Sequence, residues 1–195
     1  MLFDTHAHLN DPAFDEDRAE LLETFKDAGV GLVLNAGCSL ESSHDCIALA
    51  EAYPWIYCSV GTHPDTADEV NEDVLEAYRQ MCKHPKVKGV FHCYSGSAEM
   101  ARQLVNLGWY IGFTGVLTFK NARKAVETAA SIPLDRIVLE TDCPFMAPEP
   151  YRGKRNHPGY LPRMAEKLAQ IRGISVEEVI RITTENAKRL YRIED

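Results

Sequence analysis

Short apolar segments alternate with amphipathic segments along the whole chain of 195 residues. The apolar segments have the length of β-strands, and several are apolar on both faces, which is typical of parallel strands buried between helices. Strict alternation of apolar and polar positions, the pattern of a half-exposed antiparallel sheet, is absent from them. We predict six strands, near residues 1–8, 30–37, 55–62, 86–93, 109–116 and 136–142.

The segments between the strands have the period of amphipathic helices. In the first, Leu21, Leu22 and Phe25 share one stripe, and Gly29 follows as a helix stop. A Pro- and Gly-rich loop over 143–162 separates the last strand from two final helices. The regular alternation predicts an α/β fold with a parallel sheet surrounded by helices, in one domain over residues 1–195. The other inter-strand helices are predicted near residues 40–52, 71–83, 97–107 and 121–130.

Composition narrows the class of protein. The chain is 45% hydrophobic and 26% charged, which is ordinary for a globular protein and too apolar for disorder. Its net charge of -8 excludes a general basic field that attracts nucleic acid. Six cysteines without a Cys-x-x-Cys pair make a disulfide framework improbable. No apolar run is long enough to span a membrane, and the polar N-terminus does not resemble a signal peptide, so we predict a cytoplasmic protein.

Two histidines lie close together near the N-terminus, in Asp4-Thr5-His6-Ala7-His8-Leu9. In an extended strand, His6 and His8 point to the same side, so they form a clamp of two imidazoles. A chance pair, or two ordinary hydrogen-bonded side chains, would produce the same spacing. The metal interpretation therefore requires further ligands at the ends of other strands, because ligands of parallel sheets collect there.

Polar residues at three other strand ends meet this requirement. His63 ends the third predicted strand, His92 the fourth and Asp142 the sixth. Each alone is better explained as a satisfied core histidine or a helix cap, but together with the clamp they predict a metal site for Mg, Mn or Zn. Asp142 is also the candidate catalytic base, able to accept a proton from an attacking water in a hydrolysis.

Basic residues in the loop after the last strand suggest the substrate. Arg152, Lys154 and Arg155 are predicted to overhang the metal, where they would bind a phosphodiester or phosphomonoester. Tyr151 or Tyr160 could stack on a base. A second basic group has the spacing of the exposed side of a helix, and we interpret it as a solvated face: Lys120, Arg123 and Lys124.

Five motifs in order resemble the TatD family of metal-dependent deoxyribonucleases, within the amidohydrolase-like barrels. They are Asp4-Thr5-His6-Ala7-His8-Leu9, Gly61-Thr62-His63-Pro64, Phe91-His92-Cys93-Tyr94-Ser95-Gly96, Glu140-Thr141-Asp142-Cys143-Pro144 and Pro150-Tyr151-Arg152-Gly153-Lys154-Arg155-Asn156. The resemblance covers nearly the whole chain. It implies a TIM-type β/α barrel and metal-dependent hydrolysis of DNA, often by an exonuclease that works from the 3′ end of a single strand.

The resemblance also implies roles for single residues. His63 matches a site histidine of the family, and Arg152 lies in the loop that the family keeps near its substrate, beside Lys154 and Arg155. The residues that match the family's metal ligands are His6, His8, His92 and Asp142.

The chain departs from the family pattern in the middle. A Gly-Glu-x-Gly-Leu-Asp strand end, whose Glu bridges two metals, and a strand ending in a further histidine ligand are both absent, with the junction near Val87 and Lys88. An eight-unit barrel needs about 250 residues, so this chain has room for about six β/α units. We therefore expect an incomplete barrel with one metal ion per chain and reduced activity. The barrel could close tightly, stay open, or be completed by a second chain.

Two other interpretations stay open at this level. The chain could be a non-catalytic remnant that binds metal or nucleic acid without cleaving it, which the missing bridging Glu favours. It could also be an incomplete gene product.

Overall fold

The sheet consists of six parallel strands in two groups of three. The computed structural model describes residues 1–63, 71–73, 76–77 and 89–193. One group has the order β1-β2-β3 and the other β4-β5-β6. All six predicted strands are present, although each is shorter than its predicted range. Their bounds are β1 (Leu2–Ala7), β2 (Val30–Ala36), β3 (Ile56–Ser59), β4 (Val90–Phe91), β5 (Tyr110–Phe113) and β6 (Ile137–Leu139).

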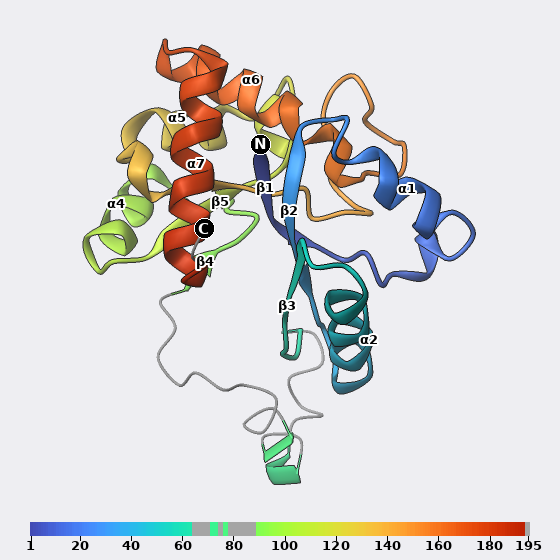
Figure 1. Cartoon of the computed structure of the whole chain (residues 1–195). Helices are drawn as coiled ribbons and strands as arrows, with labels where there is room; N and C mark the ends of the chain where they lie inside the picture. The colour runs from blue at the N-terminus through green and yellow to red at the C-terminus, as the bar shows by residue number, and fades with distance from the viewer. Residues whose placement is uncertain (64–70, 74–75, 78–88, 194–195) are drawn as a thin grey trace.

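Residues at the ends of β1 and β6 hold the two groups together. The Asp142 N–H donates to the His6 carbonyl at 2.8 Å, and the His8 N–H donates to the Cys143 carbonyl at 2.9 Å. The strands therefore follow one another in space as β3, β2, β1, β6, β5 and β4 (Figure 1). Among the described residues no strand ladder joins β3 to β4, so this part of the barrel is open. The predicted parallel α/β architecture is confirmed.

Helices follow the strands as the pattern predicted, with corrections at their ends. From the sequence, the first helix is predicted over about residues 15–28, but it begins at Arg18 because Pro12–Phe14 forms a separate 3-10 turn, and it ends at Thr24. The predicted helix over 71–83 lies largely outside the described residues. Ser39 caps the second helix by accepting the Ser42 N–H. The bounds are α1 (Arg18–Thr24), α2 (Leu40–Ala52), α4 (Ala98–Asn106), α5 (Arg123–Ser131), α6 (Leu161–Arg172) and α7 (Val176–Tyr191).

The core has two buried clusters. The larger joins residues of both strand groups to α1, α4, α5 and α6. The smaller joins Phe3, Leu34, Tyr110 and Val138 to the C-terminal half of α7. Because α7 packs on both β1 and β6, it bridges the two groups of strands.

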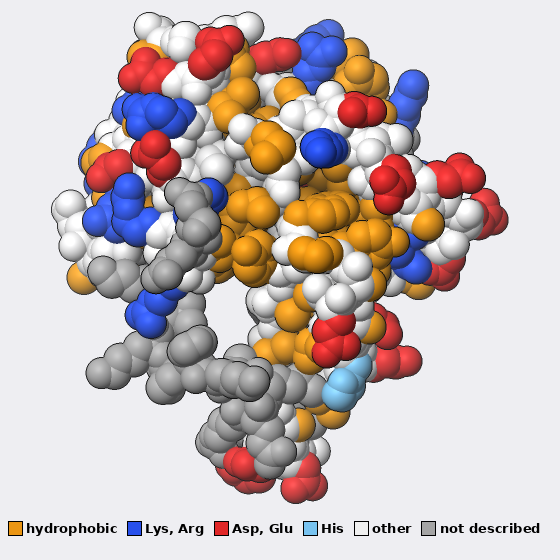
Figure 2. Space-filling view, in the orientation of Figure 1, with side chains coloured by type: hydrophobic (Ala, Val, Ile, Leu, Met, Phe, Trp, Pro, Cys, Tyr) orange, Lys and Arg blue, Asp and Glu red, His pale blue; other side chains and the backbone are white. Residues whose placement is uncertain are grey.

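The surface of the sheet is covered unevenly. On the face shown in Figure 2, apolar side chains gather over β2 and β3, beside the mixed charges of α7. No helix of the described residues is long and apolar enough to cross a membrane. The cytoplasmic location and the single domain stay predictions.

Candidate metal centre

The clamp predicted from His6 and His8 is present at the end of β1. The two Nε2 atoms are 3.1 Å apart. The His8 Nδ1 lies 2.8 Å from the Ala36 carbonyl oxygen, which fixes the ring and directs Nε2 toward His6. A backbone contact of this kind orients the imidazole in many metal sites. Cys38 also contacts His8, with its Sγ 3.5 Å from Nδ1.

Asp142 joins the clamp from the loop after β6. Its Oδ1 lies 3.7 Å from the His6 Nε2 and 3.6 Å from the His8 Nε2. The residue has a φ of 56°, in the left-handed region that side chains other than glycine seldom adopt. The hydrogen bond from its N–H to the His6 carbonyl holds it in this position. The strained backbone thus places the carboxylate beside both imidazoles.

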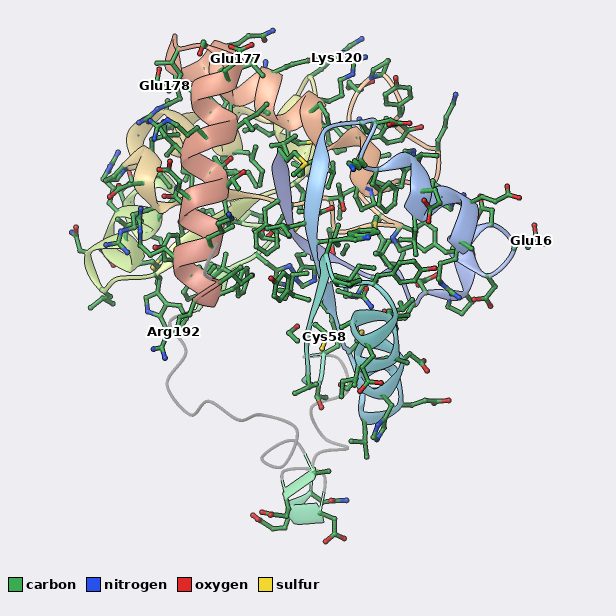
Figure 3. All side chains as sticks on the ribbon, in the orientation of Figure 1. Glu16, Cys58, Lys120, Glu177, Glu178 and Arg192 are labelled. Carbon is green, nitrogen blue, oxygen red and sulfur yellow. The ribbon has the colours of Figure 1, made fainter. Side chains whose placement is uncertain are left out.

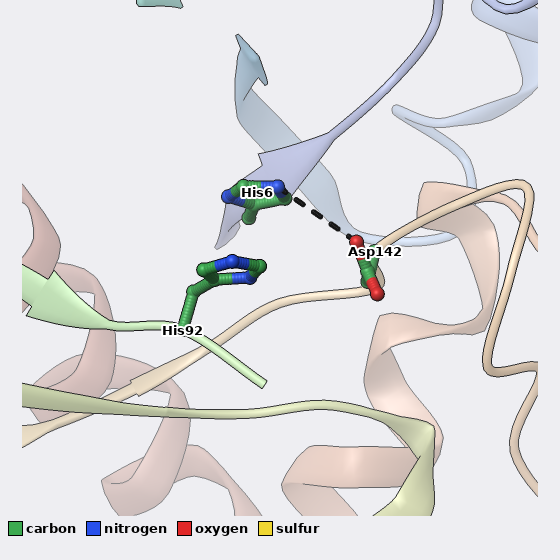
Figure 4. Close-up of side chains that lie close together, drawn as sticks. All are labelled: His6, His92 and Asp142. Carbon is green, nitrogen blue, oxygen red and sulfur yellow. Dashed lines mark ion pairs between the residues drawn. The ribbon is translucent and has the colours of Figure 1, made fainter. Parts of the chain in front are cut away.

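His92 reaches the same place from the end of β4. Its ring stacks on that of His6, with centroids 4.1 Å apart and an angle of 3° between the planes. The ligating atoms of His6, His92 and Asp142 all lie within 4.8 Å of one another (Figure 4). The four predicted ligands therefore lie together although β4 and β1 belong to different strand groups.

Two fully buried carboxyl groups support the ligands from behind. Asp4 accepts hydrogen bonds from the backbone and side chain of Thr141, and Glu140 accepts the Cys93 N–H. Burial raises the pKa of Asp4 to about 7 and that of Glu140 to about 8. Neither residue was predicted from the sequence to belong to the site. Their position could have indicated it, because each lies two residues before a predicted ligand on the same predicted strand.

The surroundings of the three imidazoles shift their pKa values in different directions. Burial, together with the nearby His92 and His8 rings, lowers the pKa of His6 to about 3. Burial also lowers the pKa of His92. For His8, burial acts in the same direction, but the contacts with Asp142 and Cys38 outweigh it and raise its pKa to about 10. At neutral pH the His6 and His92 rings are neutral and can each offer a lone pair to a divalent cation, whereas His8 must first release a proton to act as a ligand.

The ligands lie in a cavity of about 800 Å³. His63 lines this cavity as an exposed residue, and its N–H donates to the Cys38 carbonyl at 2.8 Å. The acidic lining residues are Asp11, Glu41, Asp45 and Asp142, and the described lining contains no lysine or arginine. A cavity with this charge attracts cations and repels a phosphate unless a metal is bound.

The basic loop does not face the metal as predicted. Arg155 binds Asp17, with Nη1 2.8 Å from Oδ1, and its guanidinium lies over the Phe14 ring. Arg152 lies over the Phe119 ring at 4.3 Å and lines a different cavity. Lys154 is exposed and does not line the metal cavity. The predicted placement over the metal is therefore wrong for these residues. Arg155 pairs with Asp17, Arg152 packs on the Phe119 ring, and Lys154 is exposed outside the metal cavity.

The two tyrosines of this loop stack on each other. The Tyr151 and Tyr160 rings have centroids 4.0 Å apart and planes at 3°. One face of each ring is thus already covered, which leaves less surface for stacking on a base than the sequence suggested.

Comparison with known proteins identifies the family. The model of the TatD related DNases matches residues 3–90 and 80–192. The uncharacterized metal-dependent hydrolase YabD of Bacillus subtilis is 33% identical over 254 residues, covering 99% of this chain and all of that protein. The 3'-5' ssDNA/RNA exonuclease TatD of Pectobacterium parmentieri is 26% identical over 261 residues, covering 98% of this chain and 100% of that protein.

A shorter match is closer in sequence. The uncharacterized metal-dependent hydrolase YcfH of Escherichia coli K12 is 44% identical over 106 residues, which cover 54% of this chain and 40% of that protein. The predicted junction near Val87 and Lys88 lies outside the described residues, and the internal deletion stays a prediction.

Solved structures agree on the fold. The TatD homologue YJJV of E. coli K12 matches with a TM-score of 0.90 at 23% identity, covering 99% of this chain and 98% of that one. A TatD family hydrolase of Entamoeba histolytica matches with a TM-score of 0.84 at 18% identity, covering 97% of each chain. These likenesses support the predicted TIM-type barrel, which is open in the described part of this chain. The chain belongs to the family of TatD-related DNases and is, with them, a metal-dependent hydrolase.

Proposed function

We propose that the chain hydrolyses phosphodiester bonds of single-stranded DNA with one divalent cation. The observation that carries the proposal is the convergence of three imidazoles and one carboxylate from three strands in an acidic cavity. The name of the Pectobacterium relative, a 3'-5' exonuclease of single-stranded DNA and RNA, supports the same reaction class.

The residues divide the work between binding and proton transfer. His6, His8, His92 and Asp142 would hold the cation, which supplies Lewis acidity toward the phosphoryl oxygens and activates the attacking water. The neutral rings of His6 and His92 provide lone pairs at pH 7. Asp142 would accept the proton of the water, because its carboxylate lies at the cluster where the cation would be held, beside His6 and His8. Mg, Mn and Zn are the candidate ions, and one ion per chain matches the single cluster of ligands in the described residues.

The test is a metal-titrated assay on 3′-labelled single-stranded DNA, with Asp142→Asn as the matched variant. With the wild type and at least one of the three ions, we expect release of the 3′ label as a small product, and we expect the rate of release to fall about 100-fold or more in the variant. Equal rates for the two proteins, or no product with any ion, contradict the proposal. Metal content after desalting should be near one per chain, and a value near two contradicts the mononuclear site.

The second candidate function is binding without cleavage. The opening between β3 and β4 in the described residues favours it, since a less constrained sheet holds ligands less precisely. A protein that retains metal through desalting, binds labelled DNA and releases no product would be this non-catalytic remnant.

A further inference from the structure

A second cavity of about 790 Å³ lies beside the metal cavity. The two cavities are neighbours, because consecutive residues of two segments line different cavities. His92 and Phe145 line the metal cavity, whereas Cys93 and Met146, the residues that follow them, line the second. The segments His92–Cys93 and Phe145–Met146 therefore form a wall between the two cavities.

The second cavity has the opposite charge. Arg123, Lys124 and Arg152 line it, together with Glu127 as its acidic residue. The structure records no ion pair for Arg123 or Lys124 in the described part of the chain, and both side chains are exposed. Lys120, the third member of the basic group, points to the outside (Figure 3) and does not line the cavity. Arg123 and Lys124 are thus exposed, as the expected solvated face requires, and they also line this cavity.

The wall between the cavities carries two large exposed apolar side chains. Phe145 is 56% exposed and Met146 is 42% exposed. Their backbone is held in place, since the Phe145 N–H donates to the Asp142 carbonyl and the Phe145 carbonyl accepts the side-chain amide of the buried Asn156. An exposed aromatic ring on an anchored backbone, between the candidate metal centre and a cationic pocket, is suited to stacking on a nucleobase.

We propose that the second cavity binds the phosphate next to the one at the metal, and that Phe145 stacks on the base between them. Arg123, Lys124 and Arg152 supply the positive charge that the metal cavity lacks. This inference rests on the proposed function and defines its substrate as a single strand with two consecutive phosphates. One phosphate would bind at the metal and the next in the second cavity, on the other side of the Phe145–Met146 wall.

The test compares short phosphorothioate oligonucleotides, which slow cleavage, by titration calorimetry with manganese. A trinucleotide has two linkages and a dinucleotide one. In the wild type, we expect the second linkage to tighten binding about tenfold, the effect of one charged hydrogen-bonded contact. In Lys124→Glu the gain should fall to less than about threefold, and the salt dependence of trinucleotide binding should weaken by about one phosphate contact. Arg152→Ala should reduce the same gain.

The control is Lys26→Glu, which makes the same change of charge. Lys26 is exposed and lines a separate pocket with Met1 and Val30, at the start of the strands. Lys124→Glu should fold normally, because it lies in the first turn of α5, where an acidic side chain is favourable. A tenfold gain that survives in Lys124→Glu, or one that Lys26→Glu removes equally, overturns the second phosphate site.

Phe145→Ala tests the stacking contact. We expect about tenfold weaker trinucleotide binding, whereas Phe145→Tyr, which keeps an aromatic face, should bind like the wild type. Equal affinities for the wild type and Phe145→Ala overturn the stacking role.

The outcomes of these binding tests are separate from the proposed function. A chain that cleaves DNA but shows no Lys124 effect loses only the second site, and a chain that shows the effect without cleavage loses only the catalytic proposal.

Discussion

At the scale of single residues, two carboxyl groups outside the set of candidate ligands hold the strand ends that carry those ligands. Glu140 accepts the N–H of Cys93, the residue after His92, and Asp4 accepts from Thr141, the residue before Asp142. Both carboxyl groups are fully buried, and their raised pKa values mean that the neutral form persists close to pH 7. They join strand ends without placing a full charge in the core.

Glu140→Ala should lower both stability and metal affinity. The change leaves the Cys93 N–H without an acceptor and opens a cavity, so we expect a loss of about 2–4 kcal/mol in the free energy of unfolding. Manganese should bind more weakly, because His92 loses the support of its neighbour. Urea unfolding and calorimetric titration measure the two effects. Glu140→Gln keeps the acceptor oxygen and should retain most of both, and equal behaviour of the Ala and Gln variants would contradict this role.

At the scale of elements, α7 holds the two strand groups together. Its residues Ala187 and Leu190 lie in the cluster with Phe3 and Val138, and the Tyr191 hydroxyl donates to the Thr5 carbonyl at 3.1 Å. Phe3 and Val138 come from β1 and β6, one from each group of strands. The helix therefore reinforces the junction between β1 and β6, on the side of the barrel away from the opening between β3 and β4.

Leu190→Ala should destabilise the protein strongly. The side chain is 5% exposed, and truncation of a buried leucine costs about 2–5 kcal/mol. The matched control is Leu107→Ala, at a leucine that is 76% exposed, for which we expect a change within about 0.5 kcal/mol. Urea unfolding monitored by circular dichroism measures the change in the free energy of unfolding for both variants. A similar small loss in the two variants would show that α7 does not stabilise the joined sheet.

At the scale of the whole molecule, the sheet has two edges in the described residues. β3 pairs only with β2, and β4 pairs only with β5. At the β4 edge, Phe91 is 39% exposed and lies against Trp109, with ring centroids 5.1 Å apart. Exposed strand edges with aromatic side chains favour pairing with another chain.

We propose that the chain self-associates through these edges. The expected result is a weight-average mass in sedimentation equilibrium that rises with protein concentration above that of the 21.9 kDa monomer. Phe91→Lys should lower the association by about tenfold or more, because lysine on an edge strand opposes pairing. Met100→Lys, at a methionine of α4 that is 50% exposed, is the control. A monomer at all concentrations contradicts the proposal.

Much of this protein follows from local pattern in the sequence. The period of apolar residues gave six parallel strands and the helices between them, because strand and helix periods depend on near neighbours. His6 and His8 were predictable as a pair for the same reason. The prediction that ligands gather at strand ends needed only the common direction of parallel strands, and His92 and Asp142 do lie beside the clamp.

Contacts between distant residues were decided by the tertiary structure alone. The partner of Arg155 is Asp17, far away in the chain. Arg123 and Lys124 face a cavity that forms only when α5 packs against α4, α6 and the turn over Gly115–Thr118. Whether six strands close into a ring depends on the curvature of the whole sheet, which no local period encodes. The sequence by itself singled out four candidate metal ligands, because strand direction alone brings strand ends together, and the fold decided which basic side chains lie near them.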